Sequence, residues 1–317
     1  MRKITFIILL STTLSLFATQ KNDKEFIISG YLNYNWITEQ TDLDFINYID
    51  RICYFGMSPD ENGEFTVDNK YIEKFKLVHS KMNKSQKIHL VIGGGGKVAN
   101  MHVMGNNAEK RKKYILKLAE FLDKYQFDGI DIDWETNWKT RERVPVENLV
   151  ALIKGIKKEC PSGLKITIAL GRNDREHIAT VQNMVEDASI MIYSTLNKEG
   201  LHSPLYTVKE IMQHFDKINI PHDKLLVGVP FYGKHKNGKT LVYRSICPRI
   251  NKNDSEAHII DGYSFNSIDI MKEKVKYLKE NGYRGIMIWE LTQDVPYSNR
   301  MSLLRAIYGE VHKYKVY

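Results

Sequence analysis

The sequence predicts an α/β fold, and most economically a single (β/α)8 barrel. Two observations carry this prediction: eight short, apolar, β-rich runs succeed one another along the chain, and amphipathic helical patterns separate them. Strands that are apolar on both faces and separated by helices form a parallel sheet covered by helices. The length of 317 residues suits one barrel, which typically takes about 250 residues. An open sheet of about six to eight strands is the alternative.

The predicted strands occupy residues 25–32, 49–56, 87–94, 127–135, 164–170, 188–194, 224–231 and 283–291. The clearest helical pattern between them spans residues 107–126. Its apolar side chains recur near one stripe, as expected for an amphipathic helix, and they are Tyr114, Leu116, Leu118, Phe121 and Leu122. Gly282 directly follows the last long helical pattern, where a C-cap glycine belongs.

One segment departs from this alternation. Residues 234–266, between the seventh strand and the last long helix, are polar and rich in turn residues. A hairpin or a lid fits this length, but about 33 residues are too few for an independent domain, whose usual minimum is about 50. We therefore expect one catalytic domain over residues 25–312, with a short insert and no large insertion domain.

The first 18 residues have the pattern of a secretory signal peptide. Arg2 and Lys3 form a short basic start, residues 4–16 form an apolar run, and Ala18 offers a small residue for cleavage. A membrane anchor is the alternative, but the apolar run is shorter than the roughly 20 residues that a spanning helix needs. We therefore expect an exported protein, periplasmic or secreted, that has no membrane span after cleavage.

Charge and cysteine content argue against several classes of function. The net charge is +8, but the lysines are spread along polar helix faces and form no dense basic block, so we expect no nucleic-acid partner. No Cys/His cluster has the spacing of a zinc site, and we expect no metal and no cofactor. Cys53 is expected to be a small buried residue. Disulfide pairing among Cys53, Cys160 and Cys247 stays open.

The most informative stretch is FDGIDIDWE, Phe127 to Glu135, which puts four carboxylates into a predicted buried strand. Side chains alternate between the two faces of a strand. Asp131, Asp133 and Glu135 therefore project toward the axis of a barrel, while the apolar residues between them face the helices. Asp128 has the opposite parity and is expected to be a structural or supporting acid.

Ionised carboxylates stacked at about 6–7 Å inside a low-dielectric barrel are unfavourable. The arrangement is stable only if protons are shared or hydrogen bonds hold the charge, and such neighbours push pKa values apart. A protonated carboxyl at the mouth of a barrel strand is a general acid where barrel enzymes do their chemistry. A calcium loop would carry further oxygen ligands instead of Ile and Trp between the acids, and an edge strand would not carry three acids. Catalysis is the interpretation we favour.

The stretch DGIDIDWE resembles the DxxDxDxE motif of family-18 glycoside hydrolases, the chitinase family. Five further stretches are similar to strand motifs of this family: GYLNYNW (30–36), IGG (92–94), MIYS (191–194), GVPFYG (228–233) and GIMIWELTQD (285–294). The resemblance implies a (β/α)8 catalytic domain and retaining hydrolysis of β-1,4-linked N-acetylglucosamine, in chitin or chitooligosaccharides, by substrate-assisted catalysis. The implied partner is an N-acetylglucosamine-containing oligo- or polysaccharide, and we expect a monomer.

The resemblance also implies roles for individual residues. Glu135 protonates the glycosidic oxygen, Asp133 orients the 2-acetamido group and stabilises the oxazolinium ion, and Asp131 shares a proton with Asp133. Tyr193 donates a hydrogen bond to the acetamido oxygen, and Trp289 forms the apolar floor under the distorted sugar. Ordinary core packing is the alternative for Tyr193 and Trp289. The other implied substrate-binding residues are Tyr31, Phe55 and Met191.

Two positions depart from the family pattern. Val91 replaces the Ser common before IGG, and Ser194 replaces the Asp that follows Tyr193 in the sixth-strand motif. The second change removes a carboxylate that would contact the sugar or a water. The short insert implies a cleft with a lower wall and an endo-like site. Asp294 is expected to cap a helix or loop rather than to catalyse.

Two other functions stay open. An endo-β-N-acetylglucosaminidase that cuts the chitobiose core of N-glycans would use the same mechanism with different loops. A chitinase-like lectin would bind without cutting, and the presence of Glu135 argues against it.

Overall fold

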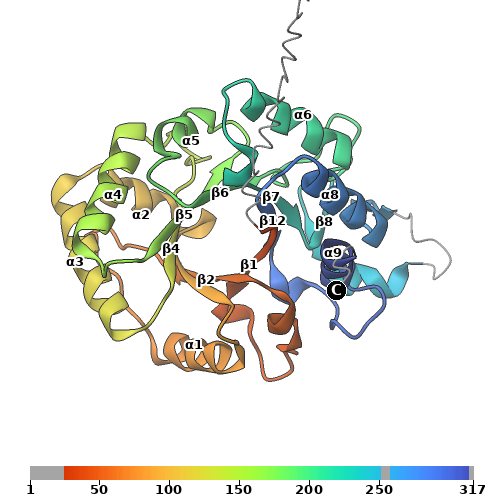
Figure 1. Cartoon of the computed structure of the whole chain (residues 1–317), viewed down its shortest axis with the longest axis horizontal. Coiled ribbons are helices and arrows are strands. Elements are labelled where there is room, and N and C mark those ends of the chain that lie inside the picture. Colours follow the sequence, from red (N-terminus) through yellow and green to blue (C-terminus); the bar gives the residue numbers. More distant parts are fainter. Residues whose placement is uncertain (1–24, 251–257, 314–317) are drawn as a thin grey trace, which may run out of the picture.

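The computed structural model describes residues 25–250 and 258–313, which form a closed barrel of eight parallel strands covered by helices (Figure 1). Around the barrel the strands follow the order β1-β12-β7-β6-β5-β4-β3-β2. The predicted (β/α)8 barrel is therefore confirmed, and the open sheet is wrong. The predicted signal peptide lies outside the described residues.

Each predicted strand overlaps one strand of the barrel. The barrel strands are β1 (Ile27–Asn33), β2 (Arg51–Met57), β3 (Lys87–Gly93), β4 (Gly129–Asp133), β5 (Lys165–Gly171), β6 (Asp187–Met191), β7 (Leu225–Pro230) and β12 (Gly285–Trp289). Strand β4 is shorter than the predicted 127–135, because its pairing with β5 ends at Ile132 and its pairing with β3 ends at Asp133.

The α-helices of the described residues are α1 (Asn69–Lys81), α2 (Val98–Gly105), α3 (Ala108–Lys124), α4 (Val146–Glu159), α5 (Arg175–Val181), α6 (Leu205–Asp216), α7 (Tyr243–Ile246), α8 (Ile268–Glu280) and α9 (Leu303–His312). Helix α3 buries the predicted stripe except for Leu116, which is 43% exposed because its spacing of two residues from Leu118 turns it outward. Gly282 follows α8 with a φ of 70°, which confirms the predicted cap.

A buried ion pair fills the amino end of the barrel interior. Arg51, at the start of β2, donates hydrogen bonds to both carboxylate oxygens of Asp187, at the start of β6, at 2.9 and 2.8 Å. The Nε of Arg51 donates to Ser29 Oγ at 3.2 Å. Both charged side chains are buried. Burial of these charges is tolerated because each has a partner.

The insert between β7 and α8 forms a small antiparallel sheet of order β10-β11-β8-β9. Its strands are β8 (Tyr232–His235), β9 (Thr240–Val242), β10 (Ile259–Ile260) and β11 (Tyr263–Ser264). Strands β8 and β9 make the hairpin expected for this segment. No other domain accompanies the barrel within residues 25–250 and 258–313, which confirms the short insert.

All three cysteines, Cys53, Cys160 and Cys247, are free and buried in the structure. Cys53 packs inside the barrel, as predicted for a small apolar residue. Among the helices that the structure describes, none combines the length and the apolarity needed to cross a membrane.

Candidate active site

Strand β4 presents its side chains on two faces, as the period of two predicts. Asp131 and Asp133 lie inside the barrel and are 1% and 3% exposed, whereas Ile130 and Ile132, which alternate with them, join the core under the helices. Trp134 packs on the helix side against α2, where a Cβ at Gly105 would come within 2.0 Å of the indole. Glu135 lies two residues beyond the end of β4, at the carboxyl mouth of the barrel.

Asp131 is held by hydrogen bonds from two other strands, the neighbouring β5 and the more distant β1. Tyr31 Oη donates to Oδ2 at 2.5 Å, and Thr167 Oγ1 donates to Oδ1 at 2.5 Å. Thr167 Oγ1 lies in turn 3.2 Å from His89 Nδ1. Burial raises the pKa of Asp131, while the hydrogen bonds from Thr167 and Tyr31 lower it. The orientation of this carboxyl is therefore set by β1, β3 and β5.

Asp133 differs from Asp131 because one of its oxygens is left unpaired. Its Oδ1 is buried and has no hydrogen-bond partner among the described residues. Burial and the nearby Glu135 and Asp131 carboxyls raise the pKa of Asp133 well above its ordinary value. A buried polar atom costs free energy unless it is paired, so this oxygen is available to a polar group of a ligand. Proton sharing between Asp131 and Asp133 stays a prediction.

Glu135 stands half-buried at the mouth of the barrel. Its backbone carbonyl accepts a hydrogen bond from His102 Nε2 at 2.9 Å. Its Oε1 lies against Gly95, where a Cβ would come within 3.1 Å. Burial and the negative charge of Asp174 raise the pKa of Glu135. The protonated carboxyl, which is the state that a general acid needs, is thereby favoured.

Tyr193 follows β6, and its ring is buried in the barrel interior. Gly228 on β7 makes room for it, because a Cβ there would come within 2.6 Å of the ring. The Tyr193 carbonyl accepts hydrogen bonds from His202 Nε2 at 2.8 Å and from Tyr232 Oη at 3.0 Å. Its hydroxyl lies 3.8 Å from Met287 Sδ, a weak acceptor. Burial raises the pKa of Tyr193, so the phenol keeps its proton for donation to a ligand.

Aromatic rings form a platform on the side of β12, β1 and β2. The ring centroid of Trp289 lies 5.4 Å from that of Tyr31 and 5.7 Å from that of Phe55. Trp36, which is 41% exposed, lies 6.3 Å from the same indole. Gly94 leaves room for Phe55, since a Cβ there would come within 2.2 Å of its ring. Such an apolar surface suits the face of a sugar ring.

A pocket of about 450 Å³ opens beside Glu135, over the ends of β4, β5 and β6. Its lining includes Trp138, Arg143, Arg172, Met191 and Ser194. We call it the arginine pocket. Met191 and Ser194 thus share the lining with Glu135, and their contact with a substrate stays a prediction. The three basic or aromatic loop residues were not predicted.

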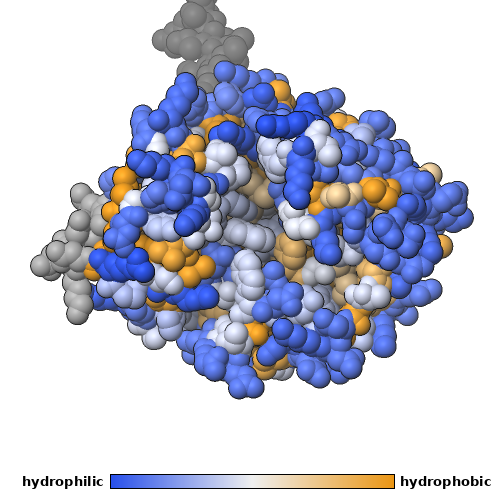
Figure 2. Space-filling view, turned by 180° about the vertical axis from the view of Figure 1, so that it is seen from behind, coloured by the Kyte–Doolittle hydropathy of each residue, from blue (hydrophilic) through white to orange (hydrophobic). Residues whose placement is uncertain are grey.

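The mouth of the barrel faces away from the viewer in Figure 1. The chain passes clockwise through its helices in that view, and right-handed βαβ connections then place the carboxyl ends of the strands on the far side. Figure 2 shows that far side, which is hollowed near its centre and framed by hydrophilic side chains.

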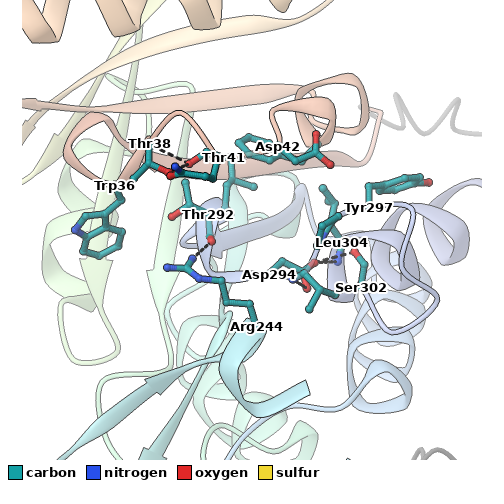
Figure 3. A pocket seen from close by; sticks show the side chains of 15 residues that line it. Trp36, Thr38, Thr41, Asp42, Arg244, Thr292, Asp294, Tyr297, Ser302 and Leu304 are labelled. Carbon is teal, nitrogen blue, oxygen red and sulfur yellow. Dashed lines mark hydrogen bonds between the residues drawn. The ribbon is translucent and has the colours of Figure 1, made fainter. Parts of the chain in front are cut away.

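A second pocket, of about 250 Å³, lies between the loops that follow β1 and β12 (Figure 3). Asp294 in its wall accepts hydrogen bonds from the backbone N–H groups of Leu303 and Leu304, at 3.2 and 2.9 Å, and from Ser302 Oγ at 2.8 Å. Burial raises the pKa of Asp294 to about 6. These bonds cap the start of α9, as predicted for this residue.

Sequence reasoning missed Glu290, the residue after Trp289. Its carboxylate accepts hydrogen bonds from the Asn33 N–H at 3.0 Å and from the N–H and hydroxyl of Thr292 at 3.0 and 2.7 Å. Burial raises the pKa of Glu290 to about 7. The acid ties the end of β1 to the end of β12, the two strands that carry most of the aromatic platform. The sequence signal that could have identified Glu290 was a carboxylate directly after an apolar predicted strand.

Asp128 lies at the opposite end of β4 from Glu135. It accepts hydrogen bonds from the Ile88 N–H at 2.9 Å and from Lys87 Nζ at 3.0 Å, so it is a structural residue. Within the described part of the chain, no group of three or more His, Cys, Asp or Glu side chains is placed to hold a metal ion.

An acid with a raised pKa beside an aromatic platform is typical of a glycoside hydrolase, and a (β/α)8 barrel presents such an acid at the end where barrel enzymes act. Residues 19–294 match the family model described as glycosyl hydrolases family 18, and the chain belongs to this family. This family is one of glycoside hydrolases.

Relatives by sequence are distant. Endochitinase 1 of Metarhizium robertsii is 22% identical over 272 residues, which cover 68% of this chain and 63% of that protein. Probable chitinase 2 of Drosophila melanogaster is 29% identical over 167 residues, 47% of this chain and 34% of that protein. The chain thus spans 63% or less of the length of these relatives.

Solved structures share the fold. The GH18 chitinase ChiB from the chitin utilization locus of Flavobacterium johnsoniae matches with a TM-score of 0.77 and 26% identity, over 92% of this chain and 95% of that one. A chitinase from Bacteroides thetaiotaomicron matches with a TM-score of 0.80 and 19% identity, over 92% and 98%. A chitinase-like agglutinin from Robinia pseudoacacia matches with 0.71 and 19%, over 89% and 99%. The last two likenesses concern the fold alone.

Proposed function

We propose that the protein hydrolyses β-1,4 bonds between N-acetylglucosamine residues of chitin or chitooligosaccharides, with the acetamido group of the substrate as the nucleophile. The observation that carries this proposal is the pair formed by Asp133 and Glu135. Asp133 keeps a buried carboxyl oxygen unpaired, and the neighbouring Glu135 has a raised pKa. Such a pair suits a substrate that brings both an N–H group and a basic leaving oxygen.

The first step breaks the glycosidic bond. A sugar lies on the Trp289 platform, and Glu135 transfers its proton to the glycosidic oxygen as the bond from that oxygen to C1 breaks. The leaving sugar departs with a hydroxyl. The carbonyl oxygen of the 2-acetamido group forms a bond to C1 from the opposite face, which gives an oxazolinium ion.

Two residues hold the acetamido group in this geometry. Asp133 accepts a hydrogen bond from the acetamido N–H and stabilises the positive charge that develops there. Tyr193 donates a hydrogen bond to the acetamido oxygen. Holding the nucleophile in place converts its attack into an intramolecular step.

The second step releases the sugar. A water attacks C1 from the face that the leaving group vacated, and the Glu135 carboxylate takes its proton. The bond between C1 and the acetamido oxygen breaks, so the acetamido group is restored. Two inversions at C1 give a product with retained configuration.

Glu135→Gln and Asp133→Asn test this assignment on chitotetraose. Each change is expected to lower kcat at least on the order of 10²-fold, the low end for a general acid, while substrate binding survives. Glu159→Gln, which removes an exposed carboxyl at the end of α4, is the matched control and keeps the rate. Undiminished turnover in Glu135→Gln would refute the mechanism, and binding without turnover in the unaltered protein would identify a lectin.

Ser194 favours a second candidate substrate, the chitobiose core of N-glycans, because the carboxylate of the family pattern is replaced by a small hydroxyl that leaves room for a branched glycan. Hydrolysis of a high-mannose glycoprotein in parallel with chitotetraose distinguishes the two. Faster release from the glycoprotein would establish the N-glycan assignment.

We also propose that residues 1–18 direct export of the chain. The basic start, apolar run and small cleavage residue support this proposal. N-terminal sequencing of the protein recovered outside the cytoplasm is expected to give a chain that begins near Thr19, and an intact Met1 there would contradict it.

A further inference from the structure

The arginine pocket lies across the mouth of the barrel from the aromatic platform. The platform rests on β12, β1 and β2, and the pocket lies over the ends of β4, β5 and β6. In the ring of strands, β5 is opposite β1 and β4 is opposite β12. Glu135 lines the pocket. If the reacting sugar lies on the platform, the sugar on the other side of the cleaved oxygen lies in the pocket.

The pocket carries two cationic side chains that form no ion pair within the described chain. Arg172 directly follows β5 and is half-buried, and Arg143 is exposed on the connection from β4 to α4. Neither forms a hydrogen bond or an ion pair within residues 25–250 and 258–313. By contrast, Arg51 and Arg249 pair with Asp187 and Asp261.

The acids of the lining offset this charge only in part. Asp174, which accepts a hydrogen bond from the Gly171 N–H at 2.9 Å and lies 3.9 Å from His177 Nδ1, contributes one negative charge against the two guanidinium groups. Burial and the charge of Asp174 raise the pKa of Glu135, which shifts it toward its neutral form. Ser194 stands where the family pattern has a carboxylate, and its carbonyl oxygen accepts a hydrogen bond from the ammonium group of Lys234. The pocket is therefore electropositive.

Trp138 gives the pocket a surface for a sugar ring. Its side chain is 61% exposed, so packing in the core does not account for it. An exposed indole offers a flat apolar face on which a pyranose can stack. A sugar-sized cavity that combines an indole with two unpaired guanidinium groups matches a sugar that carries an anionic substituent, because a guanidinium binds a carboxylate or sulfate with paired, charge-assisted hydrogen bonds.

We propose that the arginine pocket binds the leaving-group sugar, and that Arg143 and Arg172 select glycans in which this sugar carries a carboxylate or a sulfate. This inference rests on the proposed hydrolysis and adds a substrate class to it. A neutral chitin chain offers these arginines only hydroxyl and amide oxygens. An acidic glycan of alternating neutral and anionic amino sugars would satisfy both sides of the site.

Matched tetrasaccharides test the proposal. The carboxylate probe alternates N-acetylglucosamine with N-acetylmuramic acid, its methyl ester is the neutral isostere, and chitotetraose and 6-O-sulfated chitotetraose complete the set. In the unaltered protein we expect kcat/KM for the carboxylate or the sulfate probe to exceed that of its neutral counterpart by about tenfold or more at low salt, the scale of one charge-assisted hydrogen bond. The better anionic probe identifies the group.

Variants test whether Arg143 and Arg172 cause the preference for an anionic probe. In the Arg143→Gln/Arg172→Gln double variant, the ratio of anionic to neutral kcat/KM is expected to fall toward one, whereas Arg300→Gln, an exposed arginine after β12, keeps the ratio. Raising the salt concentration is also expected to lower the ratio, because it screens exposed charges.

Equal kcat/KM for the carboxylate probe and its ester, together with equal values for sulfated and plain chitotetraose, would overturn the selection while leaving the hydrolysis in place. A preference that survives in the double variant would also overturn it. Failure to cleave any of the four probes would overturn the proposed function itself.

Discussion

The two ends of the barrel interior differ in how their buried ionisable side chains are paired. At the amino end, Arg51 and Asp187 bury their charges together and pair through two hydrogen bonds. At the carboxyl end, Asp133 buries a carboxyl whose Oδ1 has no partner among the described residues. Arg51, Asp187 and Asp133 are all buried, so the two ends differ in their hydrogen-bond partners and not in burial.

This difference separates a structural site from a reactive one. The amino-end pair is satisfied within the protein and stabilises one arrangement of the strands. The carboxyl-end acids have pKa values above those of the unfolded chain, so they contribute stability at acidic pH that is lost as pH rises through the raised pKa values. In our interpretation, the Asp133 and Glu135 pair is retained because a ligand can supply the hydrogen-bond partner that Asp133 Oδ1 lacks.

The amino-end pair offers the larger effect. Asp187→Asn is expected to lower the free energy of unfolding by about 3–5 kcal/mol, because Arg51 then remains buried without its charged partner. Chemical denaturation measures this loss, and kcat per folded molecule should stay close to the original value. Joint replacement by apolar residues, Arg51→Met with Asp187→Leu, should restore much of the stability. A double variant as unstable as the single one would contradict this account of the pair.

A smaller effect is expected at the carboxyl end. Asp174→Asn removes a negative charge that raises the pKa of Glu135, while the amide oxygen can still accept the hydrogen bond from Gly171. Glu135 then loses its proton at lower pH, and the alkaline limb of the kcat/KM profile should move to lower pH. Glu176→Gln, which changes an exposed acid in the first turn of α5, is the control. An alkaline limb that stays in place would show that Glu135 does not set it.

The sequence was sufficient for the features that repeat along one strand. Alternation in β4 correctly placed Asp131 and Asp133 inside the barrel and Trp134 against the helices. The same reasoning extended the strand to Glu135, although pairing with β3 ends at Asp133. Strand ends depend on the neighbouring strand, which a single segment does not reveal.

Features that join distant segments could not be predicted in this way. Arg51 and Asp187 lie 136 residues apart, and each is an isolated charge at the start of an apolar run. Glu290 receives a hydrogen bond from Asn33, 257 residues away. Arg143 and Arg172 belong to different loops and line the same pocket because β4 and β5 are neighbours in the barrel. The arrangement of the strands in the barrel, rather than any local pattern, creates these groups.

The central claim, that the substrate supplies its own nucleophile, is tested most directly by kcat for aryl chitobiosides whose reacting sugar carries an N-acetyl, N-fluoroacetyl, N-difluoroacetyl or N-trifluoroacetyl group. Each fluorine withdraws electrons from the acetamido carbonyl, so kcat should fall steeply along the series. A kcat that is indifferent to fluorination would mean that a protein group attacks C1, and the roles assigned to Asp133 and Tyr193 would be wrong.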